Sequence, residues 1–337
     1  MLLSKLHKRL IVFLIASAVS AYIWHVNRDI FGNTIETSLI LSITTVLCIY
    51  VPFEIYFSVR DLYYDRWEKI KLSRNFEISK LRIHIDPKKK KGFIVGNLVE
   101  SIDKEKVDST RTIIIINPGL SDKKEALEYL YLPLADYGYT IFAYDSRGIG
   151  ESKKLGKRSQ FIRKIDDYKE IINWIAEQER FKDYTIYSIG MSIGALIAVS
   201  GSLTDERVKK IVAISLISEY KKNIRRLNPL ILFSFLLKGI NFFPKEEDLK
   251  LLSPTLFFNK TKLNSTHKEW ERYVNKLYLV HCKNDNIIKF RNFKKNKSIL
   301  DLPDDHCLVF KKGGHALKKN EIGLTGAVLR FLNQSSK

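Results

Sequence analysis

Short apolar runs rich in β-branched residues alternate with longer helical patterns along most of the chain after residue 110. Continuous apolar strands of this kind are typical of a parallel sheet that is buried on both faces. Helices must then cover both faces, so we expect an α/β fold with a mostly parallel, doubly wound sheet. The expected strands are residues 112–120, 139–145, 184–190, 208–216, 276–282 and 305–310, and the expected helices are residues 122–137, 161–180, 192–203 and 318–333.

Two segments depart from this alternation. Residues 81–85 and 92–100 are expected to form antiparallel strands joined by a turn that carries the solvated lysine run Lys88 to Lys91. Residues 219–273 form a helical insertion between two strands, with an apolar stretch at residues 227–243. We therefore expect one domain at residues 75–335 that contains this insertion.

The first sixty residues carry two long apolar runs. Residues 10–26 and 38–59 are each long enough to cross a bilayer as a helix, which takes roughly 17 to 25 residues. Basic residues precede the first run and follow the second, whereas the connection between them carries Arg28 against Asp29 and Glu36. The positive-inside rule then places both ends in the cytoplasm, so we expect a two-span anchor at residues 1–60 with the larger domain cytoplasmic.

Two alternatives to this hairpin remain open. Val19, Ser20 and Ala21 would suit the cleavage site of a signal peptide, in which case the second run still spans. The second run contains Pro52 and Glu54, so it could instead be a buried or interfacial helix, which would reverse the topology.

Composition excludes several functional classes. The chain has 57 lysine and arginine residues against 37 aspartate and glutamate residues, a net charge of +20. No zinc-finger, RNA-binding or nucleotide-binding motif accompanies this charge, so we expect no nucleic-acid partner, and an anionic membrane surface fits better. Three cysteines, Cys48, Cys282 and Cys307, form no disulfide framework, and their apolar neighbours indicate buried thiols. No metal-ligand spacing and no obligate protein partner are indicated.

The stretch "YSIGMSIGALIA", residues 187–198, places Ser192 between Gly190 and Gly194. The pentapeptide Gly-x-Ser-x-Gly is weak by itself, but here a strand precedes the serine and a helix follows it. A serine at such a corner adopts a strained conformation, and the flanking glycines remove Cβ clashes. Ser192 is therefore the expected nucleophile.

A nucleophilic serine needs a base, and the base needs a group that orients it. Asp285 and His315 each follow a strand, and the order Ser192, Asp285, His315 is the one typical of this strand–turn–helix architecture. Glu219 also follows a strand and remains an alternative acid. The backbone amides of Ile193 and Leu120 are the expected oxyanion donors, because one follows the nucleophile and the other follows the turn Asn117-Pro118-Gly119.

Four motifs in this order resemble the α/β-hydrolase superfamily over roughly residues 75–335. They are the segment "GYTIFAYDSRGIGES", the serine corner, the acid-bearing strand end "LVHCKNDNII" and the histidine loop "GGHA". The resemblance implies a triad of Ser192, Asp285 and His315 with no cofactor, and it makes residues 219–273 the cap over the site. Cys282 and the turn at Asn117 depart from the family pattern, and Asp145 and Arg147 are expected to hold their loop together.

This resemblance and the N-terminal runs together predict a membrane-anchored serine hydrolase that cleaves carboxylic esters, with lipid or acyl esters as substrates. A thioesterase for acyl-proteins or acyl-CoA and a serine peptidase are enzymatic alternatives on the same fold. A catalytically silent, membrane-tethered binding module is the alternative that is not an enzyme. The apolar stretch in the cap is either a roof for an acyl chain or a helix that packs on the core.

Overall fold

The computed structural model describes residues 5–63, 75–85, 92–227, 229–237 and 243–334. The chain divides into two compact units, Met1–Glu68 and Lys69–Lys337. The expected lysine turn at Lys88 to Lys91, Lys238 of the cap and the basic residues that follow the second apolar run at positions 66–71 lie outside the described residues.

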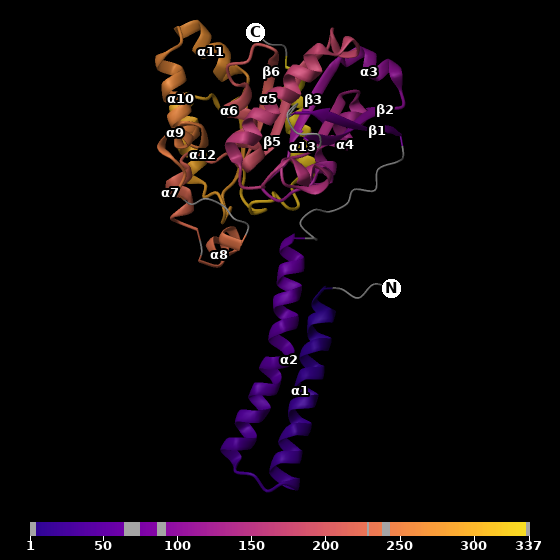
Figure 1. Cartoon of the computed structure of the whole chain (residues 1–337), viewed down its shortest axis with the longest axis vertical. Coiled ribbons are helices and arrows are strands. Elements are labelled where there is room, and N and C mark those ends of the chain that lie inside the picture. Colours follow the sequence, from indigo (N-terminus) through magenta and orange to yellow (C-terminus); the bar gives the residue numbers. More distant parts are fainter. Residues whose placement is uncertain (1–4, 64–74, 86–91, 228, 238–242, 335–337) are drawn as a thin grey trace. The chain divides into compact units, whose positions relative to one another are not determined.

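The first unit is a helical hairpin (Figure 1). Helix α1 (Lys5–His25) continues into a π-helical turn (Val26–Ile30), and α2 (Ile35–Tyr63) returns beside it. Residues Arg9–Ile30 and Ile35–Phe57 are long and apolar enough to cross a membrane, as judged by length and composition alone. The expected spans, residues 10–26 and 38–59, fall largely within these two segments.

Polar groups inside the hairpin pair between or along its helices. The Ser20 hydroxyl donates to the Ser42 carbonyl oxygen at 2.9 Å, which ties α1 to α2. Glu54 lies 3.4 Å from Arg9 and accepts a hydrogen bond from Tyr50 at 3.3 Å. The acidic residue that interrupts the second apolar run is thus neutralised within the hairpin. Cys48 is exposed on α2 and Cys307 is only half-buried, so the expectation of three buried thiols is confirmed for Cys282 alone.

The second unit is built on an eight-stranded sheet of order β1-β2-β4-β3-β5-β6-β7-β8 (Figure 1). The strands are β1 (Phe76–His84), β2 (Phe93–Ser101), β3 (Thr112–Asn117), β4 (Thr140–Asp145), β5 (Thr185–Met191), β6 (Val208–Ile214), β7 (Leu277–Cys282) and β8 (Cys307–Phe310). Strand β2 is antiparallel to both β1 and β4, and β3 through β8 are parallel to one another. All residues of β3, β4 and β7 are buried, as expected for a sheet covered on both faces.

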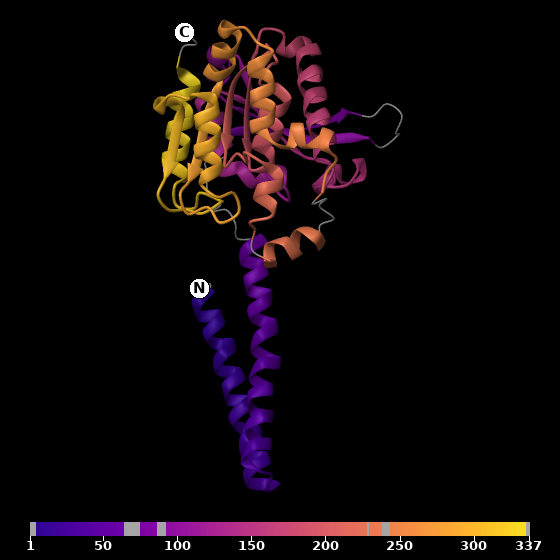
Figure 2. The same ribbon diagram turned by 90° about the vertical axis from the view of Figure 1, so that its left-hand side faces the viewer.

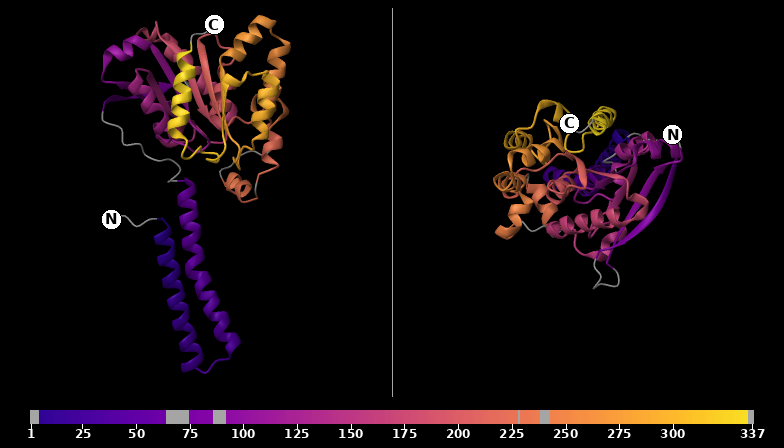
Figure 3. Two further views of the ribbon diagram at one scale, coloured as in Figure 1. Left: turned by 180° about the vertical axis from the view of Figure 1, so that it is seen from behind. Right: turned by 90° about the horizontal axis from the view of Figure 1, so that it is seen from above.

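Helices cover both faces of this sheet. Helix α5 lies in front of the sheet in Figure 1, and α13 lies in front of it when the molecule is seen from behind in Figure 3. Helix α4 packs on α13, whereas α6 contacts α5, α9 (Glu246–Leu252) and α10 (Pro254–Leu263). The remaining bounds are α3 (Lys104–Thr110), α4 (Glu128–Tyr137), α5 (Phe161–Glu177), α6 (Ile193–Ser202), α12 (Arg291–Leu300) and α13 (Glu321–Asn333). The expected doubly wound fold class is confirmed.

Two helices were not expected from the sequence. Helix α3 has only seven residues, too few to show a helical period, and begins where the Asp103 carboxylate accepts the Lys106 N–H. Helix α12 buries Asn292 and Asn296 on its inner face. The Asn296 amide donates to the Leu216 and Ile217 carbonyl oxygens, so polar side chains interrupt the apolar stripe by which such a helix is recognised.

The insertion between β6 and β7 contains five helices among the described residues. They are α7 (Tyr220–Ile224), α8 (Pro229–Leu237), α9 (Glu246–Leu252), α10 (Pro254–Leu263) and α11 (His267–Asn275), drawn in orange in Figure 2. Helices α9 and α10 contact α6, and Phe258 of α10 is fully buried in the core. These two helices therefore belong to the layer that covers the sheet, and α8 is the strongly apolar, exposed part of the insertion.

The loop after β4 is held by buried charges. The Asp145 carboxylate accepts the backbone N–H groups of Lys124 and Glu151, each at 2.9 Å. Arg147 forms a two-bond ion pair with Asp167 of α5. These contacts support the expected structural role of Asp145 and Arg147. Beside them Lys164 is buried and donates to the Ser146 hydroxyl at 3.1 Å, and burial lowers its pKa to about 7 despite the nearby Asp167.

Lys164 gives the fold a measurable pH dependence. A lysine in the unfolded chain has a pKa of about 10.4. Between pH 7 and 10 Lys164 is therefore protonated in the unfolded chain but largely neutral in the native one. The free energy of unfolding therefore rises with pH in this window, by up to about 1.4 kcal/mol per pH unit. Denaturant unfolding of the full-length protein should show that wild type gains stability from pH 7 to 9 relative to Lys164→Met.

The exposed Lys153 provides the control for this measurement. The stability difference between wild type and Lys153→Met should not change with pH. If the stability difference between wild type and Lys164→Met is also independent of pH, Lys164 is charged in the native protein at pH 7 to 9.

Candidate active site

Ser192 occupies a strained corner between β5 and α6. Its backbone has φ 57° and ψ −116°, a conformation that costs a residue with a side chain about 1–3 kcal/mol. Its N–H donates to the Ile214 carbonyl oxygen of β6 at 2.8 Å, and its carbonyl oxygen accepts from Ala195 and Leu196. The hydroxyl makes no capping bond to α6, so the helix start leaves it available for chemistry.

Glycine is required on both sides of this corner. A Cβ atom at Gly190 would overlap the Gly194 carbonyl oxygen, and a Cβ atom at Gly194 would overlap the carbonyl oxygens of Asn117 and Pro118. The predicted reason for the two glycines is thereby found in the structure. Gly194 also lets the segment after β3 lie directly against the start of α6.

The two expected oxyanion donors come from these adjoining segments. Leu120 follows the turn at the end of β3, and Ile193 is the first residue of α6. Among the described residues, neither backbone N–H donates to any group of the protein. Both amides are therefore available to a ligand, as an oxyanion hole requires.

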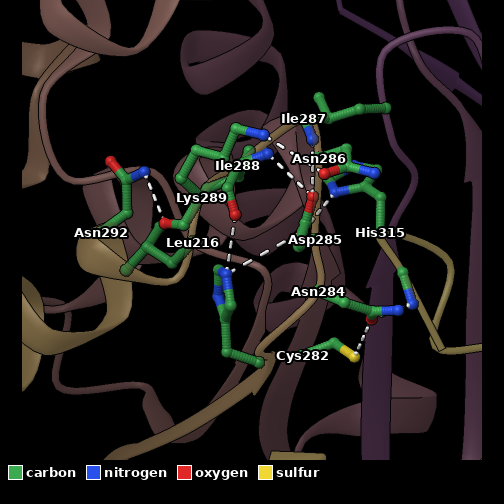
Figure 4. Close-up of polar contacts among 12 residues, drawn as sticks. Leu216, Cys282, Asn284, Asp285, Asn286, Ile287, Ile288, Lys289, Asn292 and His315 are labelled. Atoms are coloured by element: carbon green, nitrogen blue, oxygen red, sulfur yellow. Dashed lines mark hydrogen bonds and ion pairs between the residues drawn. The ribbon is translucent and has the colours of Figure 1, made fainter. Parts of the chain in front are cut away.

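Asp285 lies in a tight turn directly after β7 and uses both carboxylate oxygens (Figure 4). Oδ1 accepts the backbone N–H groups of Ile287 at 2.8 Å and Ile288 at 2.9 Å. Oδ2 lies 2.7 Å from Nδ1 of His315. Because a carboxylate only accepts, Nδ1 carries the proton and Nε2 is left free to act as the base.

The environment keeps Asp285 ionised. Burial opposes its charge, but attraction to His315 and the hydrogen bond from that ring outweigh burial, and the pKa of Asp285 lies below its ordinary value. His281 and the Ile288 amide act in the same direction. An ionised carboxylate at this place stabilises the positive charge that His315 acquires on taking a proton.

Two further residues position this pair, and sequence reasoning missed both. His281, 3.9 Å from Asp285 Oδ2, donates from Nε2 to the Ile288 carbonyl oxygen at 2.8 Å and so holds the turn; burial lowers its pKa. Asn284 Oδ1 accepts the Gly314 N–H at 2.8 Å, next to His315, and the Cys282 thiol at 2.9 Å. His281 lies inside a strand and Asn284 in a polar loop, so neither carries a sequence signal.

Glu219, the alternative acid, has other partners. It lies at the start of α7 and pairs with Lys222 at 2.9 Å and Lys295 at 2.6 Å. These two lysines lower its pKa against the opposing effect of burial. The structure thus brings Asp285, not Glu219, against His315.

Ser192, Asp285 and His315 each follow the carboxyl end of a parallel strand, namely β5, β7 and β8. The carboxyl ends of parallel strands lie at one edge of a sheet, where ligands bind in open α/β folds. No group of three or more histidine, cysteine, aspartate or glutamate side chains suited to a metal ion occurs within the described part of the chain.

Residues 108–252 match the sequence model of the serine aminopeptidase family S33, a family of α/β-hydrolases. The matched segment contains β3 with its following turn, the corner at Ser192 and the first part of the insertion. The chain has the α/β-hydrolase fold, and this segment is similar to that family. A comparison with curated protein sequences gave no match.

Solved structures with the same fold are numerous. An esterase of Pyrococcus furiosus has a TM-score of 0.51 and 18% identity, over 76% of this chain and 90% of the esterase. An acylaminoacyl peptidase of Pyrococcus horikoshii has a TM-score of 0.55 and 17% identity, over 82% of this chain and 44% of the peptidase. A 2,6-dihydroxy-pseudo-oxynicotine hydrolase has a TM-score of 0.53 and 15% identity, over 95% of this chain and 81% of that hydrolase. At these identities the likeness shows the α/β-hydrolase fold.

Substitution of the two candidate acids, Asp285 and Glu219, should affect kcat very differently. Asp285→Asn removes the charge that stabilises protonated His315, so kcat should fall on the order of 10⁴-fold, as for triad acids. Glu219→Gln breaks only partly exposed ion pairs and should change kcat less than about twofold. Hydrolysis of a p-nitrophenyl ester by the full-length variants measures both effects, and the opposite ranking would make Glu219 the acid.

Proposed function

We propose that this protein is a membrane-anchored serine hydrolase that cleaves carboxylic esters, with lipid or acyl esters as its substrates. One observation carries the enzymatic part of the proposal. A strained serine lies on the same sheet edge as a buried Asp285–His315 pair, and the Leu120 and Ile193 amides donate to no described group of the protein.

The proposed reaction follows from these groups. Ser192 Oγ attacks the acyl carbon while His315 Nε2 takes its proton, and Asp285 stabilises the charged ring. The Leu120 and Ile193 amides bind the oxyanion of the tetrahedral intermediate. His315 then protonates the leaving alcohol, and an acyl-enzyme on Ser192 remains. Water hydrolyses this ester by the same steps and restores the free serine.

Labelling of the full-length protein with a fluorophosphonate tests this assignment. The probe phosphonylates an activated serine, so wild type should be labelled and Ser192→Ala should not. The matched control is Ser298→Ala, because Ser298 is an exposed serine on α12. Labelling that persists in Ser192→Ala would exclude Ser192 as the nucleophile. A wild-type protein that is inert toward the probe and toward acyl esters would instead support a silent binding module.

The lipid preference rests on two apolar surfaces. Helices α1 and α2 are long and apolar enough to anchor the chain in a bilayer. Helix α8 exposes Phe233 and Leu236 at 59% each and Leu237 at 73%, shortly after the exposed Arg225 and Arg226. Apolar side chains next to arginines suit an anionic lipid surface. We place the catalytic unit on the cytoplasmic side, because basic residues precede the first apolar run and follow the second.

A substitution in α8 should separate lipid from soluble substrates. Leu237→Asp should lower hydrolysis of long-chain acylglycerols in anionic vesicles about tenfold or more, since an inserted leucine contributes about 1.5–3 kcal/mol. Hydrolysis of a short p-nitrophenyl ester should be unchanged. Leu263→Asp on α10 is the control, because Leu263 is 86% exposed and lies outside this surface.

Salt provides an independent readout for the same vesicles. Raising the ionic strength should slow hydrolysis in anionic vesicles, because it screens lysine and arginine from the lipid. Equal rates for wild type and both variants on every substrate would contradict a lipid-facing role of α8. An amide or acyl-CoA substrate that is preferred over all esters would favour a peptidase, to which the family match points, or a thioesterase.

A further inference from the structure

A chain of buried side-chain hydrogen bonds lies beneath the serine corner, and the catalytic mechanism above does not use it. It joins residues of three strands and two helices, and all of them are almost fully shielded from solvent. The members are Asn117 of β3, Tyr144 of β4, Ser188 of β5, Tyr168 of α5 and Ser202 of α6.

Asn117 is the centre of this chain and uses both ends of its side-chain amide. Nδ2 donates to the Ser188 hydroxyl at 3.0 Å and to the Ile189 carbonyl oxygen at 3.4 Å. Oδ1 accepts from the Tyr144 hydroxyl at 2.7 Å. One side chain therefore fastens the end of β3 to both of its neighbouring strands.

The chain continues from Ser188 into the helices. The Tyr168 hydroxyl lies 2.7 Å from Ser188 Oγ and 3.2 Å from Ser202 Oγ. The Ser202 hydroxyl donates to the Ala198 carbonyl oxygen at 2.7 Å, inside the helix that begins after Ser192. Polar contacts thus link the end of β3 to β5 and α6, the strand and helix on either side of Ser192. These contacts lie in a low-dielectric interior, where such networks resist distortion.

The place of Asn117 in the sequence gives this link its importance. Asn117 is the last residue of β3 and pairs with Gly190 of β5. Leu120 follows three residues later, and Ser188 precedes the nucleophile by four residues. The two oxyanion amides come from these two separate segments. A misplacement of about 1 Å between groups that act together can cost on the order of 10²-fold in rate.

We propose that Asn117 is a positioning residue that fixes the Leu120 amide relative to the Ile193 amide through its bonds to Ser188 and Tyr144. The proposal rests on the serine-hydrolase function proposed above. Asn117 touches no substrate atom in this account. It acts because the oxyanion lies within reach of both amides only when the ends of β3 and β5 keep their spacing.

Steady-state kinetics and inhibitor binding on the full-length protein test the proposal. Tyr144→Phe and Ser188→Ala each remove one partner of Asn117 and keep the shape of the core, whereas Asn117→Leu removes both bonds. We expect kcat on a p-nitrophenyl ester to fall by about 10- to 100-fold, while KM stays within about twofold. This loss of kcat is at most about equal to the loss on removal of a whole oxyanion donor. The affinity for a boronic acid, which forms a tetrahedral adduct on serine, should fall by a similar factor.

Tyr139→Phe is the matched control. Tyr139 is also buried, and its hydroxyl donates to Asn333 Oδ1 at 2.8 Å, in α13 and outside the chain under Ser192. This variant should lose as much thermal stability as Tyr144→Phe but keep wild-type kcat and boronic acid affinity. Equal kinetics for Tyr144→Phe, Ser188→Ala and the control would overturn the positioning role, even with a lowered melting temperature.

The outcomes also separate this proposal from the function on which it rests. A wild-type protein that hydrolyses no ester and binds no boronic acid fails the proposed function, and the positioning role fails with it. An active wild type with insensitive Tyr144→Phe and Ser188→Ala variants fails the positioning role alone.

Discussion

The site depends first on a close backbone approach between the end of β3 and the start of α6. Gly194 allows it, because any Cβ atom there would overlap the Asn117 and Pro118 carbonyl oxygens. The same approach holds Ser192 in a conformation that an isolated chain would leave, since the neighbouring strands and the helix over-determine it. The segments that carry the Leu120 and Ile193 amides adjoin at this approach, and neither amide donates to a described group of the protein.

Asp285 and His315 depend on a different constraint: the buried carboxylate must receive hydrogen bonds. An ionised carboxylate is costly in a protein interior unless hydrogen-bond donors surround it. Asp285 receives two backbone N–H groups and the His315 ring, and His281 and Asn284 hold the two loops that supply them. The contacts that stabilise the charge therefore also orient the base.

The N-terminal unit has the apolar surface that its proposed role as a membrane anchor requires. Its apolar residues are largely exposed, which water would disfavour and a bilayer would not. Some of its polar groups pair between the two helices, as Ser20 with Ser42 and Arg9 with Glu54. In the proposed membrane-anchored enzyme, the net positive charge and the exposed apolar residues of α8 would both favour contact with anionic lipid.

The sequence by itself determined the parallel sheet, the order of its strands along the chain and the serine corner. These features leave local signals, because buried strands, amphipathic helices and glycines beside a serine are each constrained by near neighbours. The sequence also named Asp285 and His315, but it left Glu219 open. Only the tertiary structure separated the two acids, since Asp285 meets His315 across thirty positions of chain whereas Glu219 meets two lysines.

Tertiary structure alone also supplied the supporting residues. Asn117, Tyr144 and Ser188 belong to apolar strands, and nothing in the local sequence indicates which side chains they bond. Their roles arise from partners on neighbouring strands, and which strands are neighbours depends on how the whole sheet is wound. A hydrogen bond between residues 117 and 188 depends on that winding, whereas a helix or a turn depends on residues a few positions away.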